Sequence, residues 1–265
     1  MKVTFLLTES SELILSFRKR LYKEFVAPLD GMWQDLHIAS STTYLIYVDN
    51  QEVGFASVDH EGALLQIFLI DEVKYKMPDC INALIDDEVI TSAKLSSIEP
   101  VSFNACLDRS LSVKKNTINY HYSIHQKKLI NPKLNTKHRK AMIRDLDSVK
   151  LFLNVEIGFD DQYGYSENII NRKEAFLFEE NGEIVAIGEC RLSDTQNSFA
   201  DLGMMVKNNQ RGKGLGTYVF SKMIDEANCK ERIPICSTTA DNIASQIAIK
   251  KAGFYATHII FDMSF

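Results

Sequence analysis

The segment with the clearest chemical pattern runs from Val206 to Thr217 and reads Val-Lys-Asn-Asn-Gln-Arg-Gly-Lys-Gly-Leu-Gly-Thr. Gly212, Gly214 and Gly216 lack a Cβ atom, so this backbone can adopt positive φ and turn several N–H groups toward one anion. Apolar periodicity predicts a helix from Leu215 to Cys229, and the start of a helix also favours negative charge. The segment therefore predicts a pyrophosphate site between a strand and a helix.

Three nucleotide-binding patterns compete for this segment. The dinucleotide fingerprint G-x-G-x-x-G does not fit, because the observed spacing is G-x-G-x-G and no acidic residue follows on a second strand of a parallel unit. The phosphate-loop string G-x-x-x-x-G-K-[ST] is absent from the sequence. The pattern Arg/Gln-x-x-Gly-x-Gly/Ala is met from Arg211 to Gly216, and a plain glycine-rich turn is the alternative interpretation.

With a second motif this segment resembles the GNAT superfamily of N-acetyltransferases. The acyl-CoA signature of that family is similar to Leu202–Val206 and Gln210–Gly216, and its N-x-x-[AS]-x-x-x-Y-x-x-x-G-F pattern is similar to Asn242–Phe254. The clear resemblance covers roughly residues 140–265. The whole chain looks, more loosely, like tandem-domain members of the family.

The resemblance implies an acetyl-CoA site between two diverging strands. It implies that backbone groups near Met204 and Val206 pair with the pantetheine arm, and that the glycine loop holds the pyrophosphate. Asn242 would hydrogen-bond the pantetheine, and it is equally well placed to cap the following helix. The full set of residues that the resemblance assigns to acetyl-CoA is Met204, Val206, Gln210, Arg211, Gly212, Lys213, Gly214, Leu215, Gly216, Thr217 and Asn242.

The catalytic acid and base are less clearly marked than the acetyl-CoA site. Ile249 stands where members of the family often have a tyrosine that protonates the departing thiolate. An amine must lose a proton before it attacks a thioester, and a carboxylate serves as the acceptor, directly or through water. Glu189 and Asp201, each on a predicted strand, are the candidate catalytic bases, although either carboxylate could simply be solvated or paired. Tyr163 and Tyr165 lie where the family builds its substrate wall.

Other residue types give no competing catalytic site. The five cysteines are scattered with no CxxC pair, and only His121 and His125 among the histidines are close in sequence, so we expect no metal site. Cys236 is better explained as a small buried side chain than as a nucleophile, because no base is clearly adjacent. A ternary mechanism without an acyl-enzyme fits this pattern.

These residues must be positioned by secondary structure, and both halves of the chain predict the same order of elements. Each half predicts a helix, a hairpin, a third strand, a helix, a strand, a short helix and a final strand, which suggests a repeat of one fold. The predicted class is α+β, with two GNAT-like domains that each contain a mixed, mostly antiparallel sheet flanked by helices. The expected boundaries are residues 1–126 for a degenerate first domain, 127–139 for a linker and 140–265 for the acetyltransferase domain.

The first half lacks the glycine loop. At the matching place it has Asp71–Pro78, where acidic residues and a proline would repel and obstruct a pyrophosphate. We therefore expect acetyl-CoA to bind only the second half. Trp33, the only tryptophan, is expected in a core or a domain interface, with a role in a lid or substrate wall as the alternative.

Composition excludes several other functions. The 265 residues carry 30 Lys and Arg against 35 Asp and Glu, a net charge of -5, which argues against a protein held on nucleic acid by phosphate contacts. The longest apolar runs are too short for a membrane span, and the unpaired cysteines fit a cytoplasmic protein. The sequence predicts an N-acetyltransferase that transfers an acetyl group from acetyl-CoA, its co-substrate, to a primary amine. A catalytically idle acyl-CoA sensor or interaction protein and transfer of a longer acyl chain remain as alternatives, and the oligomeric state is open.

Overall fold

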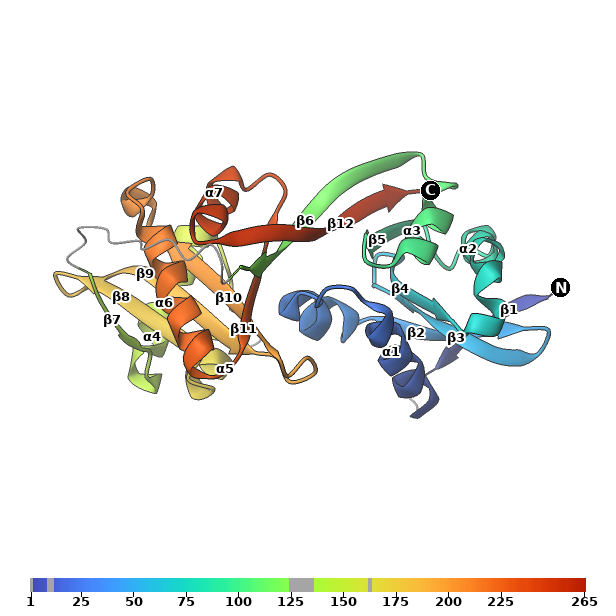
Figure 1. The fold of residues 1–265 in the computed structure, drawn as a ribbon, viewed down its shortest axis with the longest axis horizontal. Helices are drawn as coiled ribbons and strands as arrows, with labels where there is room; N and C mark the ends of the chain where they lie inside the picture. Colours follow the sequence, from blue (N-terminus) through green and yellow to red (C-terminus); the bar gives the residue numbers. More distant parts are fainter. Residues whose placement is uncertain (1, 9–11, 124–135, 162–163) are drawn as a thin grey trace. The chain divides into compact units, whose positions relative to one another are not determined.

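The structure is a computed structural model that describes residues 2–8, 12–123, 136–161 and 164–265 (Figure 1). Its internal contacts divide the chain into two compact units. Unit 1 contains Met1–Asn119 and Thr257–Phe265, and unit 2 contains Tyr120–Ala256. Each unit has a sheet of antiparallel and parallel strands flanked by helices, so the predicted fold class is confirmed.

Unit 1 is built on the strand order β1-β2-β3-β4-β5. Neighbouring strands are antiparallel except for β4 and β5, which are parallel. The strands are β1 (Val3–Thr8), β2 (Thr42–Val48), β3 (Gln51–Val58), β4 (Ala63–Leu69), β5 (Ser92–Ser96) and β6 (Ser112–Tyr122). The helical segments are α1 (Glu12–Glu24), η1 (Trp33–Ile38), η2 (Asp71–Lys76), α2 (Met77–Asp86) and α3 (Pro100–Leu107).

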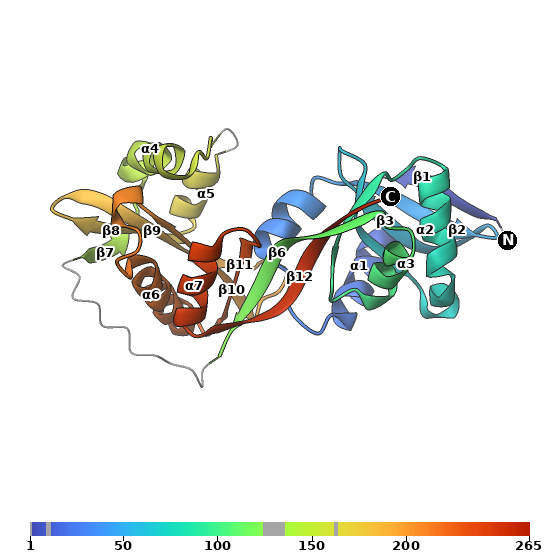
Figure 2. The same cartoon turned by 90° about the horizontal axis from the view of Figure 1, so that it is seen from above.

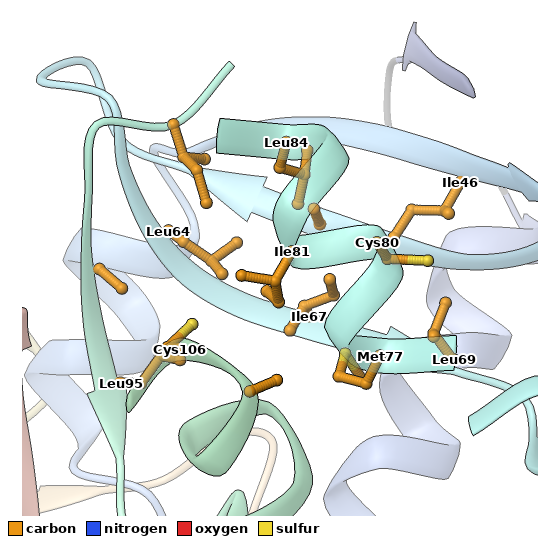
Figure 3. Close-up of a cluster of buried hydrophobic side chains, with 14 of the residues drawn as sticks. Ile46, Leu64, Ile67, Leu69, Met77, Cys80, Ile81, Leu84, Leu95 and Cys106 are labelled. Carbon is orange, nitrogen blue, oxygen red and sulfur yellow. The ribbon is translucent and has the colours of Figure 1, made fainter. Parts of the chain in front are cut away.

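Alternation along these strands gives the sheet of unit 1 two apolar faces. On one face Phe55 and Phe68 pack under Phe17 and Leu21 of α1. The opposite face packs against α2 and α3, where the labelled core includes Ile67 and Leu84 (Figure 3). Trp33 is 8% exposed and belongs to a further cluster of buried residues in unit 1, which agrees with the expectation of a core position.

Unit 2 repeats this plan with the strand order β11-β10-β9-β8-β7. Only β10 and β11 are parallel among these neighbours. The strands are β7 (Lys137–Lys140), β8 (Ala175–Glu180), β9 (Glu183–Leu192), β10 (Phe199–Val206) and β11 (Ile233–Thr239), together with the first residues of β12 (Phe254–Ser264). The helical segments are η4 (Ile143–Asp145), α4 (Leu146–Ile157), α5 (Tyr165–Asn171), η5 (Asn208–Gln210), α6 (Leu215–Cys229) and α7 (Ile243–Lys251).

The helices of unit 2 cover opposite faces of its sheet. Figure 2 shows α4 and α5 on one side of β8 and β9 and α6 on the other. Ile187 of β9 packs in the cluster that includes residues of α4 and α5. A Cβ added to the neighbouring Gly188 would lie on the other face of the sheet, 3.0 Å from Val219 of α6. Alternate residues of β9 therefore face α4 and α5 on one side of the sheet and α6 on the other, and the same holds for the residues of β10 that pair with them.

The division of the chain differs from the predicted domain boundaries at the C-terminus. Residues 257–265 lie in unit 1, where the end of β12 pairs antiparallel with β5 and places Ile260 opposite Ser96. The boundary between the units falls inside β12, and inside β6 as well. The alternating pattern of 254–265 predicts a strand correctly, but alternation does not specify which sheet a strand joins.

The expected linker is only partly covered by the structure. Residues 127–135 lie outside the described residues. Residues 137–139 belong to β7, which pairs antiparallel with β8. The basic character of this segment suggested a solvated connector, but an edge strand also tolerates exposed lysine and arginine. None of the helices in the described part of the chain is both long and apolar enough to cross a bilayer.

Candidate functional site

The two parallel strands of unit 2, β10 and β11, separate where the family resemblance implies that they diverge. Their pairing extends over only three residues of each strand, Phe199, Ala200 and Asp201 of β10 with Ile233, Pro234 and Ile235 of β11. Both strands continue, to Val206 and Thr239. Within the described residues no ladder joins these outer parts, so the edge of β10 beyond Asp201 presents backbone groups to an extended ligand.

A cavity of about 370 Å³ lies beside this edge of β10. Its walls are the end of β10, the loop before α6, the helix α7 and Ile157 at the end of α4. Eight of the eleven residues predicted for acetyl-CoA line it: Met204, Val206, Arg211, Gly212, Gly214, Gly216, Thr217 and Asn242. Segments as far apart in sequence as β10 and α7 are therefore brought to one cavity.

The glycines of the loop have the backbone that the sequence required. Gly212 has φ of 77° and Gly214 has φ of 85°, and Gly214 is the N-cap of α6. Among the described residues, no acceptor is assigned to the N–H groups from Gly212 to Thr217. Gly216 has a different role, because an added Cβ would lie 3.0 Å from the sulfur of Met204. The loop therefore combines free N–H donors with close packing of α6 on β10.

The side chain of Arg211 holds this loop in place. Its Nε donates to the carbonyl of Val206 at 3.0 Å, and its Nη2 donates to the carbonyl of Glu156 at 3.1 Å. The N–H of Asn208 donates to a carboxylate oxygen of Glu156 at 2.7 Å. Arg211 thus connects the end of β10 to the C-terminus of α4, where a cation is also favoured by the helix dipole.

Three of the predicted acetyl-CoA residues do not line the cavity. Gln210 accepts a hydrogen bond from the ammonium of Lys213 at 3.0 Å, and Lys213 is exposed. Leu215 is 3% exposed and anchors α6 in the core. The pattern of residue types alone did not distinguish side chains that face the cavity from those that fix the loop.

The charge of the cavity suits an anion. Arg211 and Lys251 are its charged lining residues, and none of the lining residues is acidic. Sequence reasoning missed Lys251, because a lysine in the last turn of a helix is explained equally well by the helix dipole. Asn242 caps α7 by accepting from the N–H of Ser245 at 3.1 Å, and it also lines the cavity.

The two candidate bases belong to one buried network on the α4–α5 face of the sheet. Glu189 is 4% exposed and Asp201 is 3% exposed. Arg191 joins them, with Nε 3.4 Å from Glu189 and Nη2 3.2 Å from Asp201. The hydroxyl of Tyr165 donates to Glu189 at 2.7 Å. The structure therefore brings together both carboxylates and one of the two candidate tyrosines.

Burial shapes the chemistry of this network. It raises the pKa of Tyr165 well above its usual value, and the negative charge of Glu189 raises it further, so the phenol stays protonated. Gly203 pairs with Glu189, and an added Cβ there would lie 2.8 Å from Oε2 of Glu189, so the glycine leaves room for the carboxylate. Neither carboxylate lines the cavity, but Met205, on the same face, does. Tyr163 lies outside the described residues.

Two further positions are placed in the core. Ile249 is 1% exposed and does not line the cavity, so this chain presents no phenol from that position. Cys236 is 3% exposed within β11. The described residues contain no group of three or more His, Cys, Asp or Glu side chains that could hold a metal ion.

In unit 1 the place of the glycine loop is taken by η2. Asp71 begins this short helix and pairs with Lys74 at 2.8 Å. Pro78 occupies the first turn of α2, where it removes one of the N–H groups that would face an anion. The described residues of unit 1 therefore contain no counterpart of the cradle.

Comparison with known proteins gives consistent matches over both halves. A family model described as an acetyltransferase (GNAT) domain matches residues 10–123, and one described as the acetyltransferase (GNAT) family matches residues 141–254. A solved structure described as an acetyltransferase from the GNAT family, from Colwellia psychrerythraea, is 30% identical, with 100% of each chain covered and a TM-score of 0.91. A search of curated proteins found no match.

More distant structures share the fold alone. A GCN5-related N-acetyltransferase from Sphaerobacter thermophilus is 9% identical, with a TM-score of 0.65 over 88% of this chain and 82% of that one. A tandem GNAT protein from the clavulanic acid biosynthesis pathway is also 9% identical, with a TM-score of 0.61 over 99% of this chain and 98% of that one. The tandem arrangement of two GNAT domains predicted from the sequence is confirmed.

Proposed function

The chain belongs to the GNAT acetyltransferase family, and from that premise we propose that it is an N-acetyltransferase with one acetyl-CoA site, in unit 2. The acetyl group passes directly to a primary amine while both substrates are bound. The observation that carries this proposal is the cavity where the free edge of β10 meets the glycine loop. An extended pantetheine arm pairs with the strand edge, and the loop N–H groups bind the pyrophosphate.

Different residues of unit 2 bind the phosphates and accept the proton of the amine. Arg211 fixes the cradle, and Lys251 supplies a second positive charge to the phosphates. Glu189 or Asp201 accepts the proton of the amine. Glu189 has the better route, because the hydroxyl of Tyr165 can take a proton from the amine side while it gives its own to Glu189. Arg191 forms an ion pair with each of the two carboxylates and so links them in one network.

The first test uses the intact chain. We expect one acetyl-CoA per chain by titration calorimetry, and a stoichiometry of two would contradict the loss of the site in unit 1. A panel of primary amines, incubated with acetyl-CoA while free thiol is measured, identifies the acceptor.

The second test assigns the base. With a turned-over amine, Glu189→Gln is expected to lower kcat on the order of 10²- to 10⁴-fold while acetyl-CoA affinity stays nearly constant. Asp201→Asn is measured beside it, because the two carboxylates share Arg191. Activity of both variants should recover at high pH, where free amine is abundant. Unchanged turnover and pH profile in both variants would exclude both carboxylates.

One observation favours a second function, an acyl-CoA sensor without turnover. Ile249 is buried at the position where members of the family often have the tyrosine that acts as general acid toward the departing thiolate. A sensor would bind acetyl-CoA with the same stoichiometry but release no thiol with any amine in the panel. The same two measurements therefore separate a catalyst from a sensor.

A further inference from the structure

Unit 1 contains a cavity of about 510 Å³ that has no part in the acetyl-CoA site. It lies between β1, α1 and the start of β2, and most of its lining is polar: Thr8, Arg18, Ser41, Thr42 and Thr43. Arg18 is the only charged residue among the lining residues. The cavity therefore presents one cation among several hydroxyl groups.

Arg18 is held in this cavity by neutral groups. Its Nη2 donates to the hydroxyl of Thr43 at 3.2 Å and to that of Ser57 at 3.0 Å. Thr43 and Ser57 face each other across β2 and β3, and their residues are 8% and 0% exposed. The guanidinium also lies 5.5 Å from the ring centre of Phe55. These contacts fix one edge of the guanidinium and its plane before any ligand binds.

No carboxylate in the described part of the chain forms an ion pair with Arg18. Its Nε is buried and has no acceptor there. Burial lowers the pKa of Arg18, opposed by the nearby Tyr22 hydroxyl. A partly desolvated guanidinium without a counter-charge is costly, and hydroxyl dipoles only partly replace water. An anion in the cavity would supply the missing charge.

We propose that this cavity binds a small organic monocarboxylate, with Arg18 as the anchor. One arginine matches one negative charge, and its Nη1 group, which donates to neither Thr43 nor Ser57, remains to donate to a carboxylate. The hydroxyls of Ser41 and Thr42 can donate to the same carboxylate or accept from a polar substituent beside it. A phosphate dianion would need more positive charge than this cavity offers. The proposal is independent of acetyl transfer, since every residue that carries it lies in unit 1.

The test measures binding of sodium lactate to the intact protein by NMR, with inorganic phosphate as the comparison anion at equal ionic strength. Arg18→Gln removes the anchor. Lys19→Gln is the matched control, because it makes the same charge change on the neighbouring, exposed residue of α1. We expect saturable lactate binding at one site that is roughly tenfold or more weaker in Arg18→Gln and unchanged in Lys19→Gln.

Further readouts keep the test decisive if Arg18→Gln does not fold. Arg18→Lys keeps the charge but loses the guanidinium plane that Thr43, Ser57 and Phe55 hold in place, and it should also weaken lactate binding. In the unaltered protein, lactate should shift backbone amide signals of residues 39–43. No lactate binding, binding of phosphate only, or shifts confined to unit 2 would each overturn the proposal. Loss of acetyltransferase activity would not affect this result, because the readout is lactate binding.

Discussion

Gly214 and Gly216 lack a side chain for different physical reasons. At Gly214 space is open, since nothing lies within 4 Å of an added Cβ, and the requirement comes from φ of 85° and from the anion expected there. At Gly216 the requirement is space, because Met204 is already close. The two glycines of one motif therefore predict different consequences of mutation, the first for binding and the second for packing.

Gly214→Asp should weaken acetyl-CoA binding by about 3 kcal/mol, roughly 100-fold in Kd, because a carboxylate would face the pyrophosphate. Titration calorimetry measures the change. Gly182→Asp is the matched control, since Gly182 also has positive φ, 83°, with nothing within 4 Å of an added Cβ, and lies in the β8–β9 turn. Equal loss of affinity in both variants would show that backbone strain, rather than charge at the cradle, is responsible.

Gly203→Ala tests the position of Glu189 without altering a charge. The new methyl group would push Oε2 of Glu189 away from the hydroxyl of Tyr165. If Glu189 is the base, kcat should fall by about tenfold or more while the Kd of acetyl-CoA is retained. The midpoint of urea unfolding should change little, because a flexible carboxylate can move. Full activity would argue that the Tyr165–Glu189 hydrogen bond is dispensable.

At the scale of elements, corresponding helices of the two units begin with different residues. Asn242 precedes α7 and Glu99 precedes α3, so Glu99, rather than Asn104 in the middle of α3, occupies the position that corresponds to Asn242. Glu99 is 5% exposed, and one of its oxygens has no partner among the described residues. The corresponding positions therefore hold a polar cap beside a cavity in unit 2 and a buried acid in unit 1.

Glu99 predicts a pH dependence of stability. Burial raises the pKa of Glu99 to about 8, so between about pH 4.5 and pH 8 the unfolded chain ionises this carboxyl while the folded chain keeps its proton. The stabilisation that this group contributes is full below that window and is lost as the pH rises through it. Glu99→Gln should remove this part of the pH dependence, so its free energy of unfolding should fall less between pH 5 and pH 8.

Urea unfolding at the two pH values measures the effect. Glu72→Gln, at an exposed position in η2, is the control and should keep the pH dependence of the unaltered protein. Parallel curves for Glu99→Gln and the unaltered protein would show that Glu99 titrates normally in the folded state.

At the scale of the whole molecule, the end of the chain belongs to the unit in which the chain begins. Ile260 and Met263 of β12 are 1% and 2% exposed and pack in clusters of unit 1. The carbonyl of Ile259 accepts from the N–H of Ser97 at 2.9 Å. A cut between residues 126 and 140 would therefore separate unit 1 from one of its own strands, and binding tests need the intact chain.

Ile260→Ala should destabilise unit 1 by about 2–5 kcal/mol, because it opens a cavity in a closely packed cluster. Hydrogen exchange of amides in β4 and β5 should become faster, whereas amides of β8 and β9 in unit 2 should change less. Ile259→Ala, at a partly exposed neighbouring position, is the control with a smaller expected effect. Faster exchange confined to unit 2 would contradict the assignment of this strand.

The sequence by itself determined the elements that carry strong local signals. Apolar periodicity predicts the helices α6 and α7, and the dipeptide Asn181-Gly182 between two apolar runs is typical of the turn that joins β8 and β9. Both patterns depend only on neighbours in the chain. The short strands β1 and β7 were missed, because four to six residues give little alternation to count. For the cradle, the spacing of its glycines was sufficient, as both positive φ values are local properties.

Only the tertiary structure decided which residues meet across the chain. Lys251 joins the cavity because α7 packs beside the glycine loop, and no local pattern reveals that contact. Glu189 and Asp201 share Arg191 because the register of β9 and β10 places Asp201 opposite Arg191. The sequence likewise did not predict that residues 257–265 belong to unit 1. Strand pairing depends on long-range packing, whereas alternation indicates only that a strand has one buried face.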